Sequence, residues 1–151
     1  MIIRSTLLFV TMAALSGYSP AFGQSSGCRS IEGAWQVSIK MHNPPPGAVD
    51  FDSLITFVGS VTIEHNGAPG SGPAIGEWSC DGGNSFRALW LKYIFNPQSG
   101  ALVGLVKIRG KLKVLSNREY SSEDIVEFYL PNGQLAASWN ATETGKRIVA
   151  E

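Results

Sequence analysis

One segment of the chain alternates strictly between basic and apolar residues, and this pattern constrains the fold more than any other. Between residues 101 and 115, alternate positions fall into two sets. The basic set is Lys107, Arg109, Lys111 and Lys113, and the apolar set is Val106, Ile108, Leu112 and Val114. Successive side chains of a β-strand point to opposite faces of a sheet. The segment therefore predicts a strand with one face in water and the other in a core.

The sequence on either side predicts further strands, separated by turns rich in Gly, Pro and Asn. The expected strands cover residues 33–41, 54–65, 74–80, 85–95, 101–115, 121–130 and 135–148. The strand over 54–65 is expected to bulge or bend at Gly59 and Ser60. Three consecutive prolines predict a long exposed loop over 42–53, and a second loop rich in Gly and Pro is expected over 66–73.

Seven strands with short connections and no helix indicate an antiparallel meander. Open sheet edges invite aggregation, so we expect an all-β fold, an antiparallel up-and-down β-barrel of about 7–8 strands. Gly104 and Gly110 fall on the apolar face of 101–115, where a missing side chain permits the coiling that closure needs. An immunoglobulin-like sandwich is the alternative, which the position of Cys28 before the first strand disfavours.

The last hairpin has two possible registers across the turn at 131–134. A two-residue turn sets Leu135, Ala137 and Trp139 beside Leu130, Phe128 and Val126. A three-residue loop with a glycine bulge would instead turn these side chains of the last strand to the opposite face of the sheet. We favour the first register because it buries more apolar side chains. In the preceding strand, Glu123 and Glu127 can stand across from the basic row of 101–115.

Residues 1–23 have the layout of a secretory signal peptide. Arg4 supplies a positive charge, an apolar run follows over 6–15, and small residues at Ala21 and Gly23 predict cleavage after Gly23. Residues 24–151 would then form one β-barrel domain, secreted or periplasmic, without stable membrane insertion. The alternative, an uncleaved membrane anchor, is disfavoured because the run is too short to span a bilayer.

Composition and charge exclude several classes of function. The chain has 12 basic and 12 acidic residues, 16% charged and 44% hydrophobic residues, which is typical of a folded domain and not of a disordered one. Removing Arg4 leaves 11 basic residues against 12 acidic ones. A neutral balance gives no general attraction to phosphate backbones, so we expect no nucleic-acid partner.

The two cysteines, Cys28 and Cys80, both follow the expected cleavage site. In an oxidising compartment an even number of cysteines favours a disulfide, which would link the N-terminal segment to the barrel wall. The alternative is two separate thiols, too far apart to join. Two cysteines without a cluster of histidines do not make a zinc site, so we expect neither a metal ion nor a cofactor.

Gly33-Ala34-Trp35, at the start of the first strand, resembles the G-x-W signature of lipocalins and other calycin barrels. The resemblance implies that Arg147, near the end of the last strand, lies across the Trp35 ring and binds backbone carbonyls at the closed end of the barrel. Further segments are similar to small bacterial lipocalin-like proteins, a largely uncharacterised family. They are residues 76–78, 85–88, 126–129, 131–133 and 141–147.

A small barrel either fills its interior with side chains or leaves room for a ligand. We expect a small, mostly apolar molecule to bind in an interior cup. The candidate ligand-binding residues are Trp78, Phe86, Trp90, Lys92, Phe128 and Trp139. Lys92 shares a face with Phe86 and Trp90, so it lies either at the barrel mouth, ready for a carboxylate or carbonyl group, or outside if a bulge shifts the register.

Two other functions remain open. Similar barrels support an enzyme that cyclises or isomerises a small hydrophobic substrate, and a barrel with a filled core could instead act through its surface. A buried Lys92, His65 or Glu77 beside a void would favour the enzyme, whereas an unbroken apolar lining would favour binding. No motif frames a nucleophile, and His42 and His65 are expected to be surface histidines, so no catalytic residue is assigned.

Overall fold

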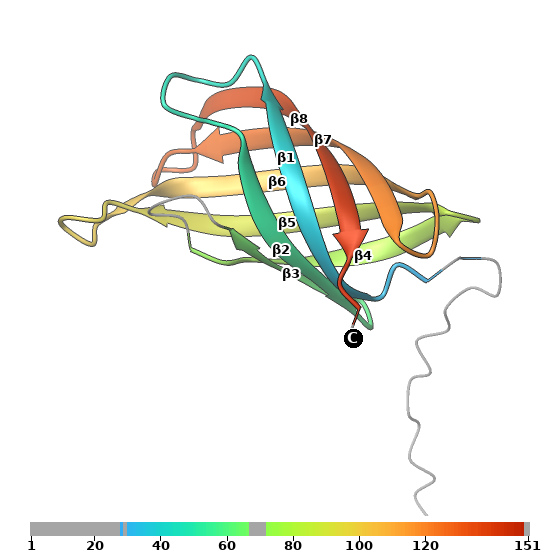
Figure 1. Cartoon of the computed structure of the whole chain (residues 1–151). Coiled ribbons are helices and arrows are strands. Elements are labelled where there is room, and N and C mark those ends of the chain that lie inside the picture. Colours follow the sequence, from blue (N-terminus) through green and yellow to red (C-terminus); the bar gives the residue numbers. More distant parts are fainter. Residues whose placement is uncertain (1–27, 29, 67–71, 150–151) are drawn as a thin grey trace, which may run out of the picture.

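The chain folds into a closed barrel of eight antiparallel strands, seen in a computed structural model that describes residues 28, 30–66 and 72–149 (Figure 1). The strands are β1 (Gly33–His42), β2 (Phe51–Val58), β3 (Val61–Asn66), β4 (Ala74–Gly82), β5 (Ser85–Phe95), β6 (Leu102–Val114), β7 (Glu119–Tyr129) and β8 (Leu135–Arg147). Each pairs with the next along the chain, and β8 pairs with β1 to close the barrel. The predicted all-β, up-and-down barrel is confirmed, and the sandwich alternative is wrong.

The prediction of one bulged strand over 54–65 is wrong. The chain reverses at Gly59 and Ser60, so that β2 and β3 form a hairpin in which Val58 lies opposite Val61. Gly59 has a φ of 57°. That left-handed conformation suits a tight turn and is costly for residues with a side chain. The loop predicted over 42–53 is also shorter than expected, because β2 already begins at Phe51.

The remaining strands lie close to their predicted positions. The prediction for 85–95 matches β5, whereas the turn expected over 81–84 is shorter because β4 continues to Gly82. In the last hairpin, Ala137 lies opposite Phe128 and Trp139 opposite Val126, as in the favoured register. A register shift after Phe128 pairs Leu135 with Tyr129 rather than with Leu130.

One end of the barrel, here called the closed end, is filled by aromatic side chains. Trp35 and Tyr120 meet edge to face with ring centres 5.0 Å apart, and Phe57 contacts both Tyr120 and Trp90. The indole nitrogen of Trp35 donates a hydrogen bond to the Ile31 carbonyl at 2.9 Å. These rings are almost fully buried and pack against one another, so they fill the interior at this end of the barrel.

A disulfide joins Cys28 to Cys80, whose Cα atoms are 6.4 Å apart. It ties the segment before β1 to β4, and the alternative of two separate thiols is wrong. The predicted signal peptide, residues 1–23, lies outside the described residues, as does most of the loop expected over 66–73. Among the described residues, no helix has the length and apolar character that crossing a bilayer requires.

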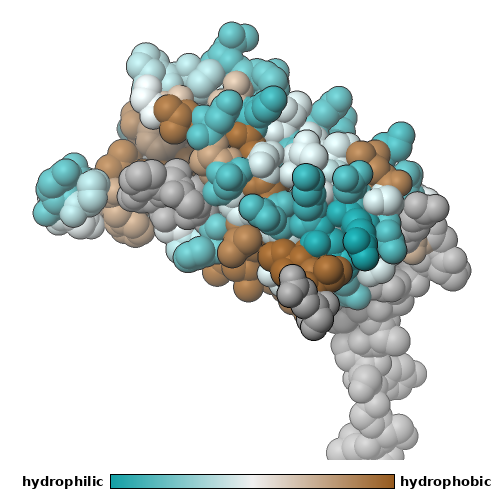
Figure 2. All heavy atoms as spheres, in the orientation of Figure 1, coloured by the Kyte–Doolittle hydropathy of each residue, from teal (hydrophilic) through white to brown (hydrophobic). Residues whose placement is uncertain are grey.

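The outer wall is basic and acidic on one side and partly apolar on another. The basic row of β6 faces the acidic residues of β7, and Arg109 forms an ion pair with Glu127 at 2.5 Å. Figure 2 shows hydrophobic side chains at the surface over β2 and β3. The exposed apolar residues of β2 to β5 include Leu54, Val58, Val61, Ile63, Ile75, Leu89, Leu91 and Tyr93.

Candidate functional site

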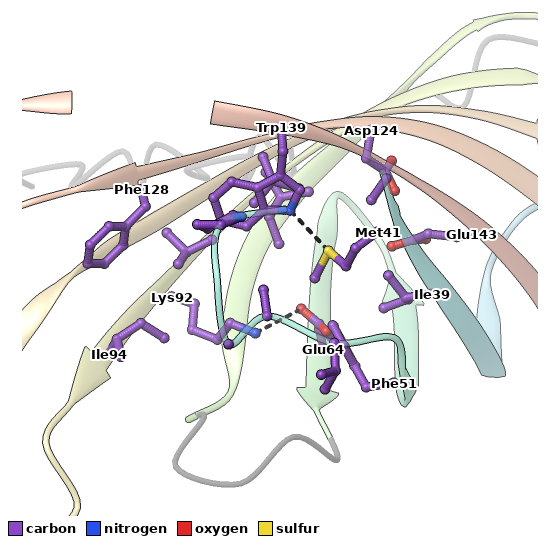
Figure 3. A pocket seen from close by; sticks show the side chains of 18 of the residues that line it. Ile39, Met41, Phe51, Glu64, Lys92, Ile94, Asp124, Phe128, Trp139 and Glu143 are labelled. Carbon is purple, nitrogen blue, oxygen red and sulfur yellow. Dashed lines mark hydrogen bonds and ion pairs between the residues drawn. The ribbon is translucent and has the colours of Figure 1, made fainter. Parts of the chain in front are cut away.

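The half of the barrel opposite the closed end encloses a cavity of about 470 Å³ (Figure 3). Its walls are mostly apolar and come from strands around the barrel. The wall residues include Ile39, Phe51, Val106, Val126, Phe128 and Trp139. The indole nitrogen of Trp139 donates to the Met41 sulfur at 3.0 Å, which fixes the ring against β1. A cavity of this size and lining is typical of a site for a small ligand.

The proline-rich loop between β1 and β2 covers the cavity, and its residues 45–49 line it. Prolines fix the local backbone angles, which limits how many conformations the loop adopts. The Ala48 amide donates to the Pro45 carbonyl at 3.2 Å, forming a turn. The Asp50 carboxylate accepts a hydrogen bond from the Met41 amide at 2.8 Å and so ties the end of the loop to β1. The loop is therefore held as a cover over the apolar walls.

Four ionisable side chains line the cavity although they are nearly inaccessible to solvent. Glu64 on β3, Asp124 on β7 and Glu143 on β8, here called the carboxyl cluster, are 2%, 3% and 5% exposed, and Lys92 on β5 is 5% exposed. The Lys92 ammonium lies 3.9 Å from a Glu64 oxygen. Ser53 donates to the other Glu64 oxygen at 3.1 Å. Among the described residues, three buried carboxyl groups thus accompany one buried lysine.

Asp124 and Glu143 receive hydrogen bonds from neighbouring side chains of β7. Ser122 donates to Oδ1 of Asp124 at 2.5 Å, and the Tyr120 hydroxyl donates to Glu143 at 3.2 Å. Oδ2 of Asp124 is buried and receives no hydrogen bond from a hydroxyl or amide group of the described residues, and the Asp124 carboxyl shares a proton with the neighbouring Glu143 carboxyl. Opposite Asp124 on β6 lies Gly110, where a Cβ atom would come within 2.7 Å of Oδ1. The glycine therefore leaves the space that Asp124 occupies.

Burial changes the protonation of these groups. It raises the pKa of Asp124 to about 6, although the hydrogen bond from Ser122 acts in the opposite direction. Burial and the negative charges of Asp124 and Glu64 raise the pKa of Glu143 well above its ordinary value. Burial lowers the pKa of Lys92, against the attraction of Glu64. A hydrogen bond between the two carboxyl groups lowers the pKa of Asp124 and raises that of Glu143, so Glu143 holds the shared proton more tightly than Asp124 does.

The structure divides the six candidate ligand-binding residues between the two halves of the barrel. Lys92, Phe128 and Trp139 line the cavity. Trp78 and Phe86 contact each other edge to face in the aromatic packing of the closed end. Trp90 donates from its indole nitrogen to the Thr62 hydroxyl at 3.1 Å, and none of these three rings is among the residues that line the cavity.

Lys92 lies inside the barrel, so the alternative that placed it outside is wrong. His65 and Glu77, the other two groups that would have favoured an enzyme beside a void, are both exposed. His42 is exposed as well and contacts the Thr142 hydroxyl. Asp52 accepts a hydrogen bond from Ser38 at the surface. Lys92 is therefore the one member of that set beside the cavity.

Sequence reasoning missed the carboxyl cluster, although the strand pattern around two of its members placed an acidic residue on a core-facing side. Asp124 shares its strand face with Val126 and Phe128, and an acidic residue at a core position of that kind marks a functional site. Glu143 stands two residues from the buried Ala141, on the same face. Glu64 was hidden, because Ile63 beside it is 43% exposed and the apolar and polar faces of β3 are reversed relative to the usual pattern.

The described residues contain no group of three or more His, Cys, Asp and Glu side chains arranged to hold a metal ion. No protein-family model, curated protein or solved structure matches the chain.

Proposed function

We propose that this protein is an exported barrel that binds a small, mostly apolar molecule in its interior. The observation that carries the proposal is the cavity of about 470 Å³, which has mostly apolar walls, a proline-rich cover and a few polar groups in one region. Pockets of roughly 300–1,000 Å³ with such a lining hold small molecules in many proteins. A barrel that acted only through its surface would have no need of this interior space.

The lipocalin-like resemblance supports this proposal. The barrel closes with eight antiparallel strands, and the Arg147 guanidinium lies over the Trp35 ring at the filled end. The other end is hollow and lined by side chains of seven strands. A barrel with one filled end and one hollow end is suited to holding a ligand at a fixed depth.

Export is supported by the disulfide between Cys28 and Cys80. Disulfides persist in secreted and periplasmic proteins and are rare where thiols are kept reduced. Together with the signal-like pattern of residues 1–23, it supports the proposal that the mature domain covers residues 24–151. N-terminal sequencing of the exported protein tests the point: a start at Gln24 supports cleavage after Gly23, and a start at Met1 contradicts it.

Binding can be tested with N-phenyl-1-naphthylamine, an uncharged dye that fluoresces in apolar surroundings. The wild-type protein should bind one dye per chain. Ala141→Phe should abolish most of this binding, because Ala141 is buried and lines the cavity. Ser138→Phe adds the same ring at an exposed position on the same strand and serves as the control. Equal binding by the wild-type protein and Ala141→Phe would contradict an interior site.

The second candidate is an enzyme that cyclises or isomerises a small hydrophobic substrate. Lys92 beside the cavity favours it, as do the raised pKa values of Asp124 and Glu143, since proton transfer needs groups that titrate near the working pH. The two candidate functions can be distinguished with the molecule that is released when the exported protein is unfolded. If the molecule is recovered unchanged after incubation with catalytic amounts of the protein, binding is the function; conversion to an isomer that Lys92→Met abolishes favours the enzyme.

A further inference from the structure

We propose that the molecule in the cavity carries one positive charge, as a protonated amine on an apolar body. This inference rests on the proposed function and specifies the class of ligand. It is drawn from the carboxyl cluster of Glu64, Asp124 and Glu143 and from the buried Oδ2 of Asp124, which no cation of the described residues contacts.

The first step is the balance of charge inside the barrel. Lys92 and Glu64 form an ion pair, so their charges offset each other. The hydrogen bond between Asp124 and Glu143 needs a proton on one of the two carboxyl groups, so the pair carries one negative charge rather than two. No buried cation among the described residues offsets this charge, because Lys92 is paired with Glu64. An ionised carboxylate that is shielded from solvent is costly unless it is paired. A ligand with a single positive charge would supply the partner.

The second step is the hydrogen bonding of the same carboxylate. Ser122 donates to Oδ1 of Asp124 and the Glu143 carboxyl shares a proton with this residue, while Oδ2 is buried and receives no hydrogen bond from a hydroxyl, an amide or a cation of the described residues. A carboxylate oxygen accepts hydrogen bonds and an ammonium group donates up to three of them. An amine placed in the cavity beside Asp124 would therefore satisfy Oδ2 and pair its charge in one contact.

The third step excludes an anionic ligand. Lys92 is the cation that would pair with an acidic ligand, but its ammonium already lies 3.9 Å from Glu64 and burial lowers its pKa. A carboxylate entering the cavity would meet the carboxyl cluster at short range and be repelled. The rest of the ligand would lie against the apolar walls, which include Phe128 and Trp139 (Figure 3).

Three probes of similar shape and different charge test the inference: 1-naphthylmethylamine, 1-naphthylmethanol and 1-naphthoate. Their affinities for the full mature protein are measured by calorimetry at pH 7.5. The amine should bind most tightly, the alcohol more weakly and the carboxylate most weakly. If the alcohol binds as tightly as the amine, the affinity of the cavity does not depend on the charge of the ligand. The inference then fails, and the proposed function stands. If none of the three binds, both fail.

Variants then test whether Asp124 is the carboxylate that pairs with the amine. Asp124→Asn should weaken binding of the amine by roughly thirtyfold or more, because it removes one partner of a buried charge pair, and should leave the alcohol unaffected. Glu123→Gln, the exposed neighbour on the same strand, should change neither affinity. Dye binding by Asp124→Asn shows that the variant is folded. Equal loss of amine affinity in Glu123→Gln would assign the effect to the surface and overturn the inference.

The pH dependence gives a readout that a purely structural role for Asp124 would not produce. Amine binding should fall as the pH drops from 7.5 through about 6, where Asp124 takes up a proton. The groups that act on Asp124 are Tyr120, Ser122 and Glu123 on β7, Glu143 on β8 and Glu64 on β3. In Asp124→Asn this fall should disappear. An unchanged pH profile in that variant would contradict the inference.

Discussion

The guanidinium carbon of Arg147 lies 4.3 Å from the centre of the Trp35 ring, across the pair of strands that closes the barrel. The same side chain donates hydrogen bonds to three backbone carbonyls, those of Asn117 at 2.7 Å, Ser30 at 3.2 Å and Glu32. One residue therefore joins the segment before β1, the turn between β6 and β7, and the last strand. Its location far from the cavity separates its structural role from ligand binding.

Arg147→Ala should destabilise the protein without changing how much ligand it binds. The loss of a ring contact and of hydrogen bonds from a charged group corresponds to about 2 kcal/mol. The melting temperature should fall by roughly 5 °C. Lys146→Ala, at the exposed neighbouring position, is the control. A melting temperature for Arg147→Ala equal to that of the wild-type protein would refute the role of Arg147 at the closed end.

Removal of the disulfide should lower the free energy of unfolding. The bond between Cys28 and Cys80 spans 52 residues, and cross-links of this kind contribute about 2–4 kcal/mol. Urea unfolding of the Cys28→Ser/Cys80→Ser variant and of the oxidised wild-type protein measures the difference. Coincident unfolding curves would show that the bond is absent from the purified protein or makes no contribution.

Lys92→Met should destabilise the barrel because it leaves Glu64 buried without its cation. Breaking a buried ion pair costs about 3–5 kcal/mol, whereas replacing both partners with apolar residues is often nearly neutral. The double variant Lys92→Met/Glu64→Leu should therefore recover much of the stability. A double-mutant cycle in urea measures the coupling. Additive losses would mean that the two side chains do not interact.

Asp124 should make stability depend on pH. Its pKa is about 6 in the folded chain and 3.8 ordinarily, so the folded state holds the proton more tightly. The resulting contribution is fully present below pH 3.8 and is lost as the pH rises through about 6, which amounts to about 3 kcal/mol. Relative to Asp124→Asn, the wild-type protein should lose stability between pH 4 and pH 7. Parallel pH profiles for the two proteins would contradict a raised pKa.

The barrel could be predicted from the sequence because its strands alternate clearly. In β6, the basic residues stand outside and Leu112 and Val114 are buried, as the pattern indicated. The hairpin of β2 and β3 could not be predicted so easily. Gly59 and Ser60 suit a bulge as well as a turn, and only pairing with β4 on the other side of β3 distinguishes the two.

The candidate site was harder to predict than the fold. Aromatic residues such as Trp90 and Trp139 look alike in a strand pattern, and their positions along the barrel axis decide which fills the closed end and which lines the cavity. Glu64 gave no signal because Ile63 beside it faces solvent. Contacts between distant strands, such as that of Lys92 with Glu64, arise only once the register of the whole barrel is set.

Native mass spectrometry of the protein, purified from the exported fraction of its own host, tests the central claim most directly. We expect a species heavier than the bare chain by one small molecule, which dissociates when the protein is unfolded. The Ala141→Phe variant, with its cavity partly filled, should lack this species. The bare chain alone, found in repeated extractions of the wild-type protein, would contradict a ligand-binding function for the cavity.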